Sequence, residues 1–266
     1  MARVPTQVVI AAYHDENAAD QIADAVKMAK MRGMLSYKNV AVVRKTEKGK
    51  VKIKETGDMS GGIGATVGAV VGGGLGLLAG PGGLVAGAAA GAVIGGAGAG
   101  LHDAGIPDER LKEIGGVLGN GNSAFIAIFQ EAKVDKATMK EVDKGAAEAV
   151  ESLAVDIGST LQAGQDVAYV FAVTEEGVVA ERVAAGEEAA DIQALVVTPA
   201  GAVAASAAAT EEGVAYEVAT ASEEGVAFEA GVITEEGAAA VGAAATEDEA
   251  IAGAAVITPD EKEGKE

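Results

Sequence analysis

The first part of the chain alternates between hydrophobic and polar blocks that predict short strands and helices. A β-branched run predicts a strand over residues 7–13. Hydrophobic residues then recur every three or four positions, which predicts a helix that begins with Asp15 as its N-cap and ends at Gly33. Two strands over residues 37–44 and 50–55 follow, joined by a short polar turn. The predicted order is strand, helix, strand, strand.

Three more elements complete this part of the chain. Residues 108–118 predict a short helix, residues 123–130 a buried strand and residues 135–153 a second amphipathic helix. This order is typical of the ferredoxin-like split βαβ fold, in which helices cover one face of an antiparallel sheet. We therefore expect an α+β domain formed by residues 1–58 and 102–160.

An uncharged glycine-rich segment interrupts this domain. Residues 59–101 contain 43 residues without an ionisable side chain, and 17 of them are glycine. The spacing predicts two helices of about 20 residues, joined at Pro81, each with a groove that lets another helix approach closely. The predicted helix-packing interface consists of glycines at four-residue intervals in two registers: Gly64, Gly68, Gly72, Gly76 and Gly80, then Gly83, Gly87, Gly91 and Gly95.

This helical hairpin has two alternative environments. Each arm is long enough to cross a hydrocarbon layer, and a cluster of Lys and Arg residues lies just upstream, between Arg44 and Lys54. Glycine and alanine are only weakly apolar, however, which equally suits a hairpin buried within a protein assembly. A disordered linker is the third alternative, but linkers use Ser and charged residues rather than Leu, Val and regularly spaced Gly.

Residues 166–261 repeat with a period of 12. Turn motifs such as Thr-Glu-Glu-Gly begin at 12-residue intervals from Thr174 to Thr258, and the blocks between them alternate with a period of two. We expect eight strands in an antiparallel meander, either open or closed into a barrel. A helical interpretation and a β-solenoid with 12-residue coils remain as alternatives.

The repeat strands are rich in Ala, Gly and Ser, as in the sequences AVAASAAA and AAAVGAAA. Such strands bury little area, so we expect neighbouring copies of the chain to supply the missing burial. The edges of an open meander would also invite strand addition from another subunit.

Charge is distributed unevenly along the chain. Residues 166–266 contain 22 acidic and 3 basic residues, whereas the preceding 165 residues are nearly neutral. The acidic part should repel nucleic acid, so we expect no nucleic-acid partner. Paired acids at the turns could bind divalent cations. The favoured interpretation is that these acids act as gatekeepers, which are charged residues that keep the apolar sheet soluble. Residues 262–266 are expected to be a disordered tail.

Catalytic and cofactor chemistry has little support. The chain has no Cys and two His, and both His-Asp pairs, at His14 and His102, fall at predicted element ends where capping is the common role. Two loose G-x-G-x-x-A matches lie in unsuitable contexts, and no P-loop or nucleophile-elbow motif occurs. We predict no catalytic, cofactor-binding or metal-binding residues, and no enzyme activity.

The segments VVIAAYHDENAADQI, VAVVRKTEKGKVKIKET, the glycine-rich hairpin, LHDAGIPDERLKEIG and NSAFIAIFQEA resemble, in that order, the DUF1269 family over about residues 6–155. The resemblance implies membrane association, since members are described as predicted membrane proteins. It implies no established activity and no catalytic residues. The acidic repeats lie outside it.

Together these patterns predict a non-enzymatic, self-assembling structural protein. Homo-oligomers would form through glycine-groove packing and β-repeat contacts, as a filament, a shell or a membrane-associated assembly. The alternative is an oligomeric membrane protein, an anchor or pore inserted through residues 59–101, with lipid as a partner. The first residues are too quickly acidic for a classical signal peptide, so the expected location is cytoplasmic or membrane-associated, with export by another route left open.

Overall fold

A computed structural model describes residues 2–57, 108–134, 152–174 and 177–258. The chain divides into two compact units, Met1–Gly186 and Glu187–Glu266, hereafter unit 1 and unit 2. Antiparallel sheet dominates both units, and the described helices all lie in unit 1. The α+β class is thus supported for unit 1.

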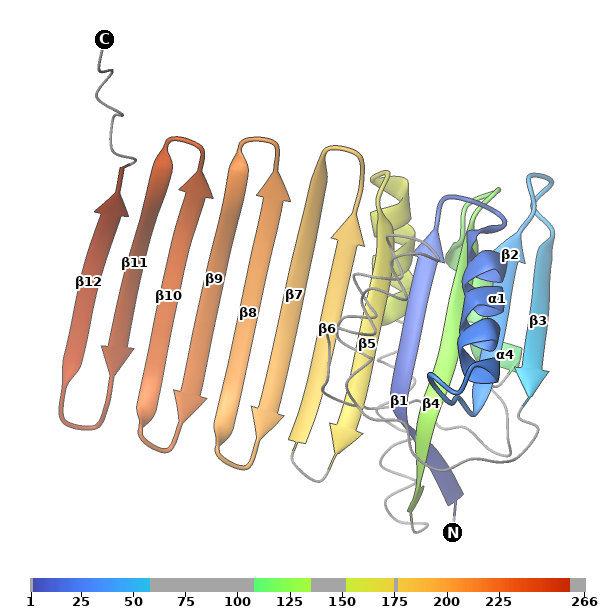
Figure 1. The fold of residues 1–266 in the computed structure, drawn as a ribbon, viewed down its shortest axis with the longest axis horizontal. Coiled ribbons are helices and arrows are strands. Elements are labelled where there is room, and N and C mark those ends of the chain that lie inside the picture. Colours follow the sequence, from blue (N-terminus) through green and yellow to red (C-terminus); the bar gives the residue numbers. More distant parts are fainter. Residues whose placement is uncertain (1, 58–107, 135–151, 175–176, 259–266) are drawn as a thin grey trace. The chain divides into compact units, whose positions relative to one another are not determined.

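Unit 1 contains an antiparallel sheet in which the spatial order of the strands differs from their order in the chain. Its strands follow one another in space as β6, β5, β1, β4, β2 and β3, and each neighbouring pair is antiparallel (Figure 1). Their bounds are β1 (Ala2–Tyr13), β2 (Asn39–Lys45), β3 (Val51–Gly57), β4 (Ser123–Val134), β5 (Asp166–Thr174) and β6 (Gly177–Ala185).

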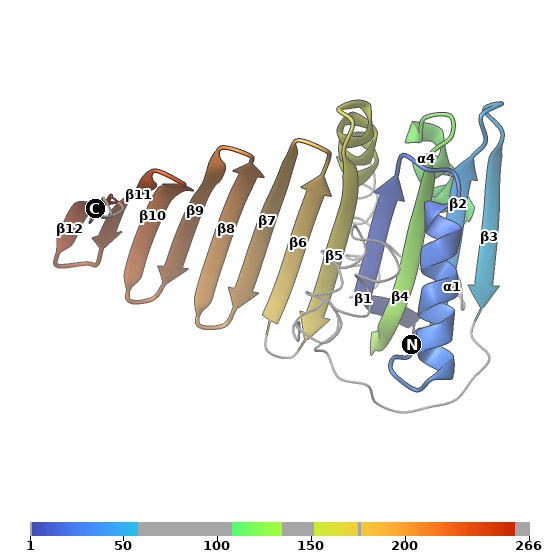
Figure 2. The same cartoon turned by 45° about the horizontal axis from the view of Figure 1, so that its top comes forward.

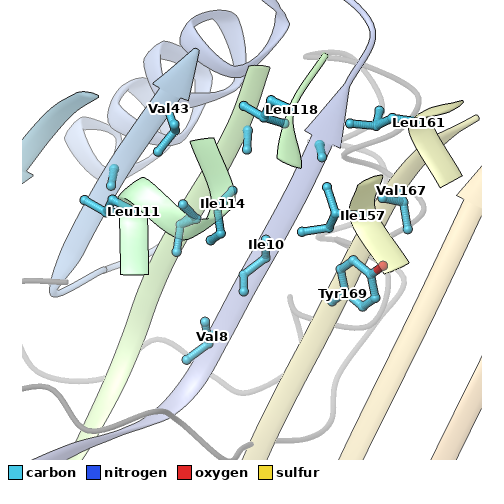
Figure 3. Packing of buried hydrophobic residues seen from close by; sticks show 14 of the residues in the cluster. Val8, Ile10, Val43, Leu111, Ile114, Leu118, Ile157, Leu161, Val167 and Tyr169 are labelled. Atoms are coloured by element: carbon cyan, nitrogen blue, oxygen red, sulfur yellow. The ribbon is translucent and has the colours of Figure 1, made fainter. Parts of the chain in front are cut away.

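Helices cover both faces of this sheet. Helix α1 (Ala18–Met31) buries Ile22 and Val26 with the odd-numbered side chains of β1, such as Val9. Helix α4 (Asp108–Val117) and the helix over residues 152–162 pack on the opposite face, against even-numbered side chains such as Ile10. Figures 1 and 2 show α1 on one side of the sheet and α4 on the other, and Figure 3 shows the second cluster.

The predicted ferredoxin-like frame is wrong in two respects. Such a fold would give the order β4-β1-β3-β2, whereas β4 here lies between β1 and β2 and pairs with both. Helices also cover both faces rather than one. The reason is visible in the strands: residues 8–13 of β1 and 124–128 of β4 are continuously apolar, which is typical of strands that are buried on both faces.

Unit 2 is an antiparallel meander in which each strand pairs with the next one in the chain. The strands are β7 (Ala189–Thr198), β8 (Gly201–Thr210), β9 (Gly213–Ser222), β10 (Gly225–Thr234), β11 (Gly237–Ala245) and β12 (Ala250–Ile257). The period of 12 therefore corresponds to one strand and one turn. The meander is open, neither a barrel nor a solenoid, and the helical alternative is wrong.

The hairpin turns from β7–β8 to β10–β11 are tighter than the predicted four-residue loops, whereas the β11–β12 loop has four residues. Thr210 and Gly213 already form the last pair of the β8–β9 ladder, which leaves two glutamates in the loop. The Thr210 hydroxyl oxygen accepts a hydrogen bond from the Glu212 N–H at 3.2 Å, and the same bond recurs at Thr198, Ser222 and Thr234. These short loops maintain the register from one strand to the next.

Several predicted elements lie outside the described residues. They are the glycine-rich segment 59–101, the part of the predicted helix over residues 135–151, and the tail 262–266. Within the described part of the chain, none of the helices has both the length and the apolar character needed to span a membrane. The boundary after Gly186 places β5 and β6 in unit 1, whereas the 12-residue period predicts one repeat domain over residues 166–261.

Candidate interaction surface

The strands of unit 2 carry almost no charge. Asp191, Glu217 and Glu229 are the charged residues within β7–β12, and every other acid of residues 187–257 lies in a turn. These turns form an acidic rim along both ends of the strands. Because the faces between the rims carry only these three charges, they are the part of unit 2 best suited to contact another macromolecule.

No described residue of unit 2 is buried. The sheet is a single layer, so both of its faces meet solvent in the isolated chain. The most bulky side chains are left half-exposed, with Phe228 at 43% and Val241 at 54%. Apolar side chains normally gain about 25 cal/mol per Å² when they leave water, and here that free energy has not been gained.

One face of the sheet consists mostly of small side chains, with a few larger ones between them. Strand pairing places Phe228 between Ala219 of β9 and Ala243 of β11. A shallow groove of about 620 Å³ runs beside Phe228 and is lined mainly by alanines. We name this side the Phe228 face. Its larger apolar members include Leu195, Val197, Val226, Phe228, Val232 and Val241, and the carboxylates Asp191 and Glu217 lie on the same side.

The opposite side of the sheet, the Tyr216 face, contains one ordered polar contact. The ring of Tyr216 lies across Gly231 of the neighbouring strand, where a Cβ atom would come within 2.7 Å of the ring. Its hydroxyl donates a hydrogen bond to Glu229 Oε1 at 2.7 Å. This bond to a carboxylate raises the pKa of Tyr216 above its usual value. The larger residues of this face include Ile192, Val203, Val214, Tyr216, Ile233 and Ile251.

The acidic turns do not converge into a metal centre. Within the described residues, no group of three or more His, Asp or Glu side chains is arranged to hold a metal ion. The paired glutamates of successive turns instead lie in rows along the rim. Divalent cations as partners of these turns therefore remain a prediction.

Unit 1 contains a polar cluster that ties its helix 152–162 to the sheet. Asp156 accepts hydrogen bonds from Tyr169 at 2.5 Å and from Arg182 Nε at 2.7 Å, and Arg182 also donates to Thr160 at 2.9 Å. Burial raises the pKa of Asp156, but the bonds and the charge of Arg182 outweigh it and lower the pKa overall. Every member of this cluster is paired, so we interpret its role as structural: it holds the helix against β5 and β6.

His14 lies at the end of β1, where the sequence predicted a capping role. One ring nitrogen lies 2.7 Å from Asp166 Oδ1 and the other lies 2.6 Å from the Leu161 carbonyl oxygen. The backbone N–H of His14 also donates a hydrogen bond to Asp166 Oδ1 at 2.8 Å. These contacts connect β1 to β5 and to the end of the helix over residues 152–162. His102 lies outside the described residues.

The predicted helix-packing glycines, Gly64 to Gly95, all lie outside the described residues, so their packing remains a prediction. The structure instead draws attention to the exposed faces of unit 2. The small side chains of these strands predict little buried area, and the alternation of residues such as Phe228 and Glu229 is the signal that the sequence offers for these faces. It could not assign residues to a shared face, because that depends on the register between strands.

Comparison with protein families gives one match. Residues 64–162 match the model of a protein of unknown function, DUF1269. The resemblance seen in the sequence is confirmed over these residues, which include the glycine-rich segment from residue 64 onward, α4 and β4. The match begins after β3 and ends before unit 2. Neither the curated proteins nor the solved structures include a significant match to the chain.

Proposed function

We propose that this chain is a non-enzymatic structural protein that assembles with copies of itself. The observation that carries the proposal is the absence of any buried residue among the described residues of unit 2, combined with strand faces that have three charged residues. A face of this kind becomes stable when a second layer covers it, since packed sheets lie about 10 Å apart and exclude water between them.

The Phe228 face is the proposed packing surface. Its groove accepts side chains from a facing sheet, and Phe228, Val226 and Leu195 are the protrusions that would enter the matching groove of another copy. The acidic rims would remain in solvent at the ends of the strands. They would limit growth in that direction and keep the assembly soluble.

The glycine-rich segment supplies the second proposed contact. Its four-residue glycine period suits close helix packing, either between the arms of one hairpin or between subunits. The match to DUF1269 includes this segment, but that family has no established function. Substitution of Gly72 by Leu would fill the proposed groove, and we expect smaller oligomers from that variant.

The test is the size of the full-length protein, purified without detergent and measured by analytical ultracentrifugation and electron microscopy. We expect particles or fibres far larger than one 26.1 kDa chain. Phe228→Lys places a charge on the packing face and should raise the concentration needed for assembly at least tenfold.

Glu224→Gln is the matched control, because it also changes the net charge by one but lies in a turn. It should assemble at least as readily as the wild type. A wild-type protein that is monomeric at all concentrations would refute the proposal, and a pellet that dissolves only in detergent would favour the membrane alternative.

A further inference from the structure

The last strand of unit 2 forms an edge with unpaired backbone groups. All eight residues of β12 pair with β11, from Ala250 opposite Ala245 to Ile257 opposite Ala238, without a register shift. In the described part of unit 2, no strand lies on the other side of β12. A row of backbone N–H and C=O groups is therefore available for another strand.

This edge lacks the features by which sheets usually prevent such pairing. The sequence of β12, AIAGAAVI, has no charged residue and no proline. Its Ile251, Val256 and Ile257 are 70%, 74% and 68% exposed, the largest values for bulky residues in unit 2. By contrast, the edge strand β3 of unit 1 carries Lys52, Lys54 and Glu55. Edge strands are normally protected by charges, prolines or bulges, and β12 is not.

The charges beside β12 favour antiparallel self-pairing. The turn before the strand holds three consecutive acids, Glu247, Asp248 and Glu249. Parallel pairing of two copies would place these triplets next to each other. Antiparallel pairing places them at opposite ends of an eight-residue strand, roughly 26 Å apart, which exceeds the screening length of about 8 Å at physiological salt. Each triplet is then level with the sequence that follows β12 in the other copy, where Asp260-Glu261-Lys262 has a smaller net charge than a second triplet.

The side chains fit a two-fold axis through the strand. In a register centred on Ala254, Ile251 of one copy faces Ile257 of the other, and Ala252 faces Val256. Both ends of the interface then gain an apolar pair, and the small Gly253 and Ala255 lie between them. Such an axis also keeps the Phe228 faces of both copies on the same side.

We propose that β12 is the docking edge for β12 of a second copy. The two strands pair antiparallel about a two-fold axis at Ala254 and continue the sheet of unit 2 from one chain into the next. This inference rests on the proposed function and names one of its contacts. It differs from packing through the Phe228 face, which stacks one sheet on another.

Disulfide cross-linking of the full-length chain tests the proposal directly, because the chain contains no Cys. Opposed residues of antiparallel strands have Cα atoms about 4.5–5.5 Å apart, which is within disulfide range. With oxidised glutathione, Ala254→Cys should give a covalent dimer in most molecules. Ala252→Cys is the matched control, with the same residue type, strand and face, but the two copies of it would lie more than 13 Å apart.

Equal cross-linking at both positions, or none at either, would overturn the proposal. A second variant removes dependence on cysteine: Ile251→Lys should reduce dimer affinity at least tenfold, whereas Ile233→Lys, on an inner strand, should not. If Phe228→Lys prevents assembly but Ala254→Cys does not cross-link, the edge contact is rejected and the proposed function is retained. Cross-linked dimers without any larger particle would support the edge and reject the proposed function.

Discussion

At the scale of single residues, long-range hydrogen bonds decide details that local patterns miss. Asp15 was predicted to cap α1, but the N-cap position is Asn17, whose side chain makes no capping bond. The buried Ser123 of β4 accepts a bond from the Ala19 N–H at 3.2 Å and donates to the Asp15 carbonyl oxygen at 2.5 Å. The capping group thus lies 104 residues away, beyond the reach of any local motif.

The buried Glu181 of β6 makes unit 1 sensitive to pH. Its side chain is 7% exposed, and its Oε2 atom has no hydrogen-bond partner among the described residues. Burial raises the pKa of Glu181 to about 7, from 4.5 in an exposed carboxyl. The folded state therefore holds this proton more tightly than the unfolded state does, and stability should fall as pH rises from about 4.5 through 7.

We expect the free energy of unfolding of unit 1 to drop over this range by roughly 2 kcal/mol, allowing for solvent screening. Glu181→Gln should abolish this part of the pH dependence and stabilise the protein at pH 8. Exposed Glu188→Gln serves as the control and should keep the wild-type profile. Thermal unfolding by circular dichroism between pH 5 and 8 measures the effect, and identical profiles for the wild type and Glu181→Gln would contradict it.

At the scale of elements, the turns of unit 2 from β7–β8 to β10–β11 depend on glycine at one position. Gly201, Gly213 and Gly225 each have φ between +147° and +149°, a region that side chains rarely adopt. A Cβ atom at Gly225 would also lie 2.2 Å from the Ala245 carbonyl oxygen. The repeated glycine of the Thr-Glu-Glu-Gly motif is therefore required by the turn itself.

Gly225→Ala should destabilise the β9–β11 region by about 1–3 kcal/mol, because alanine is strained at this positive φ and the Ala245 carbonyl must move. Gly253→Ala is the matched control, since nothing lies within 4 Å of a Cβ atom there. Hydrogen exchange with mass spectrometry, read on peptides from residues 213–245, reports the difference. Equal protection in the two variants would show that the turn tolerates a side chain.

At the scale of the whole molecule, charge should oppose assembly. Residues 187–257 contain 14 acids and no base, and the chain carries a net charge of −20. Copies that approach one another therefore repel at low salt. Screening shortens this repulsion, as the Debye length falls from about 10 Å at 0.1 M to about 3 Å at 1 M salt.

We expect the mean particle size in solution to grow between 0.05 and 0.5 M NaCl, measured by light scattering at constant protein concentration. The double variant Glu223→Gln, Glu224→Gln removes two rim charges and should reach the same size at lower salt. Magnesium chloride at the same ionic strength as NaCl separates screening from specific binding. Screening alone gives the same particle size in both salts, whereas specific binding of Mg²⁺ gives a different size. Particles that dissociate as salt is added would contradict this expectation.

The sequence by itself determined the local elements of this protein. The strand near residues 7–13, the end of α1 at Gly33 and the 12-residue strand period are confirmed, because each depends on side-chain alternation or on a residue in its own turn. Gly33 has φ +71° and donates to the Lys30 carbonyl, as a helix-ending glycine does. Local physics is sufficient for such features.

Only the tertiary structure decided which strands are neighbours. The insertion of β4 between β1 and β2, and helices on both faces of the sheet, follow from apolar side chains more than 100 residues apart that pack together. Likewise, the exposed β12 edge exists because the meander of unit 2 stays open. Pairing order depends on the summed burial of distant segments, which periodicity within any one segment does not encode.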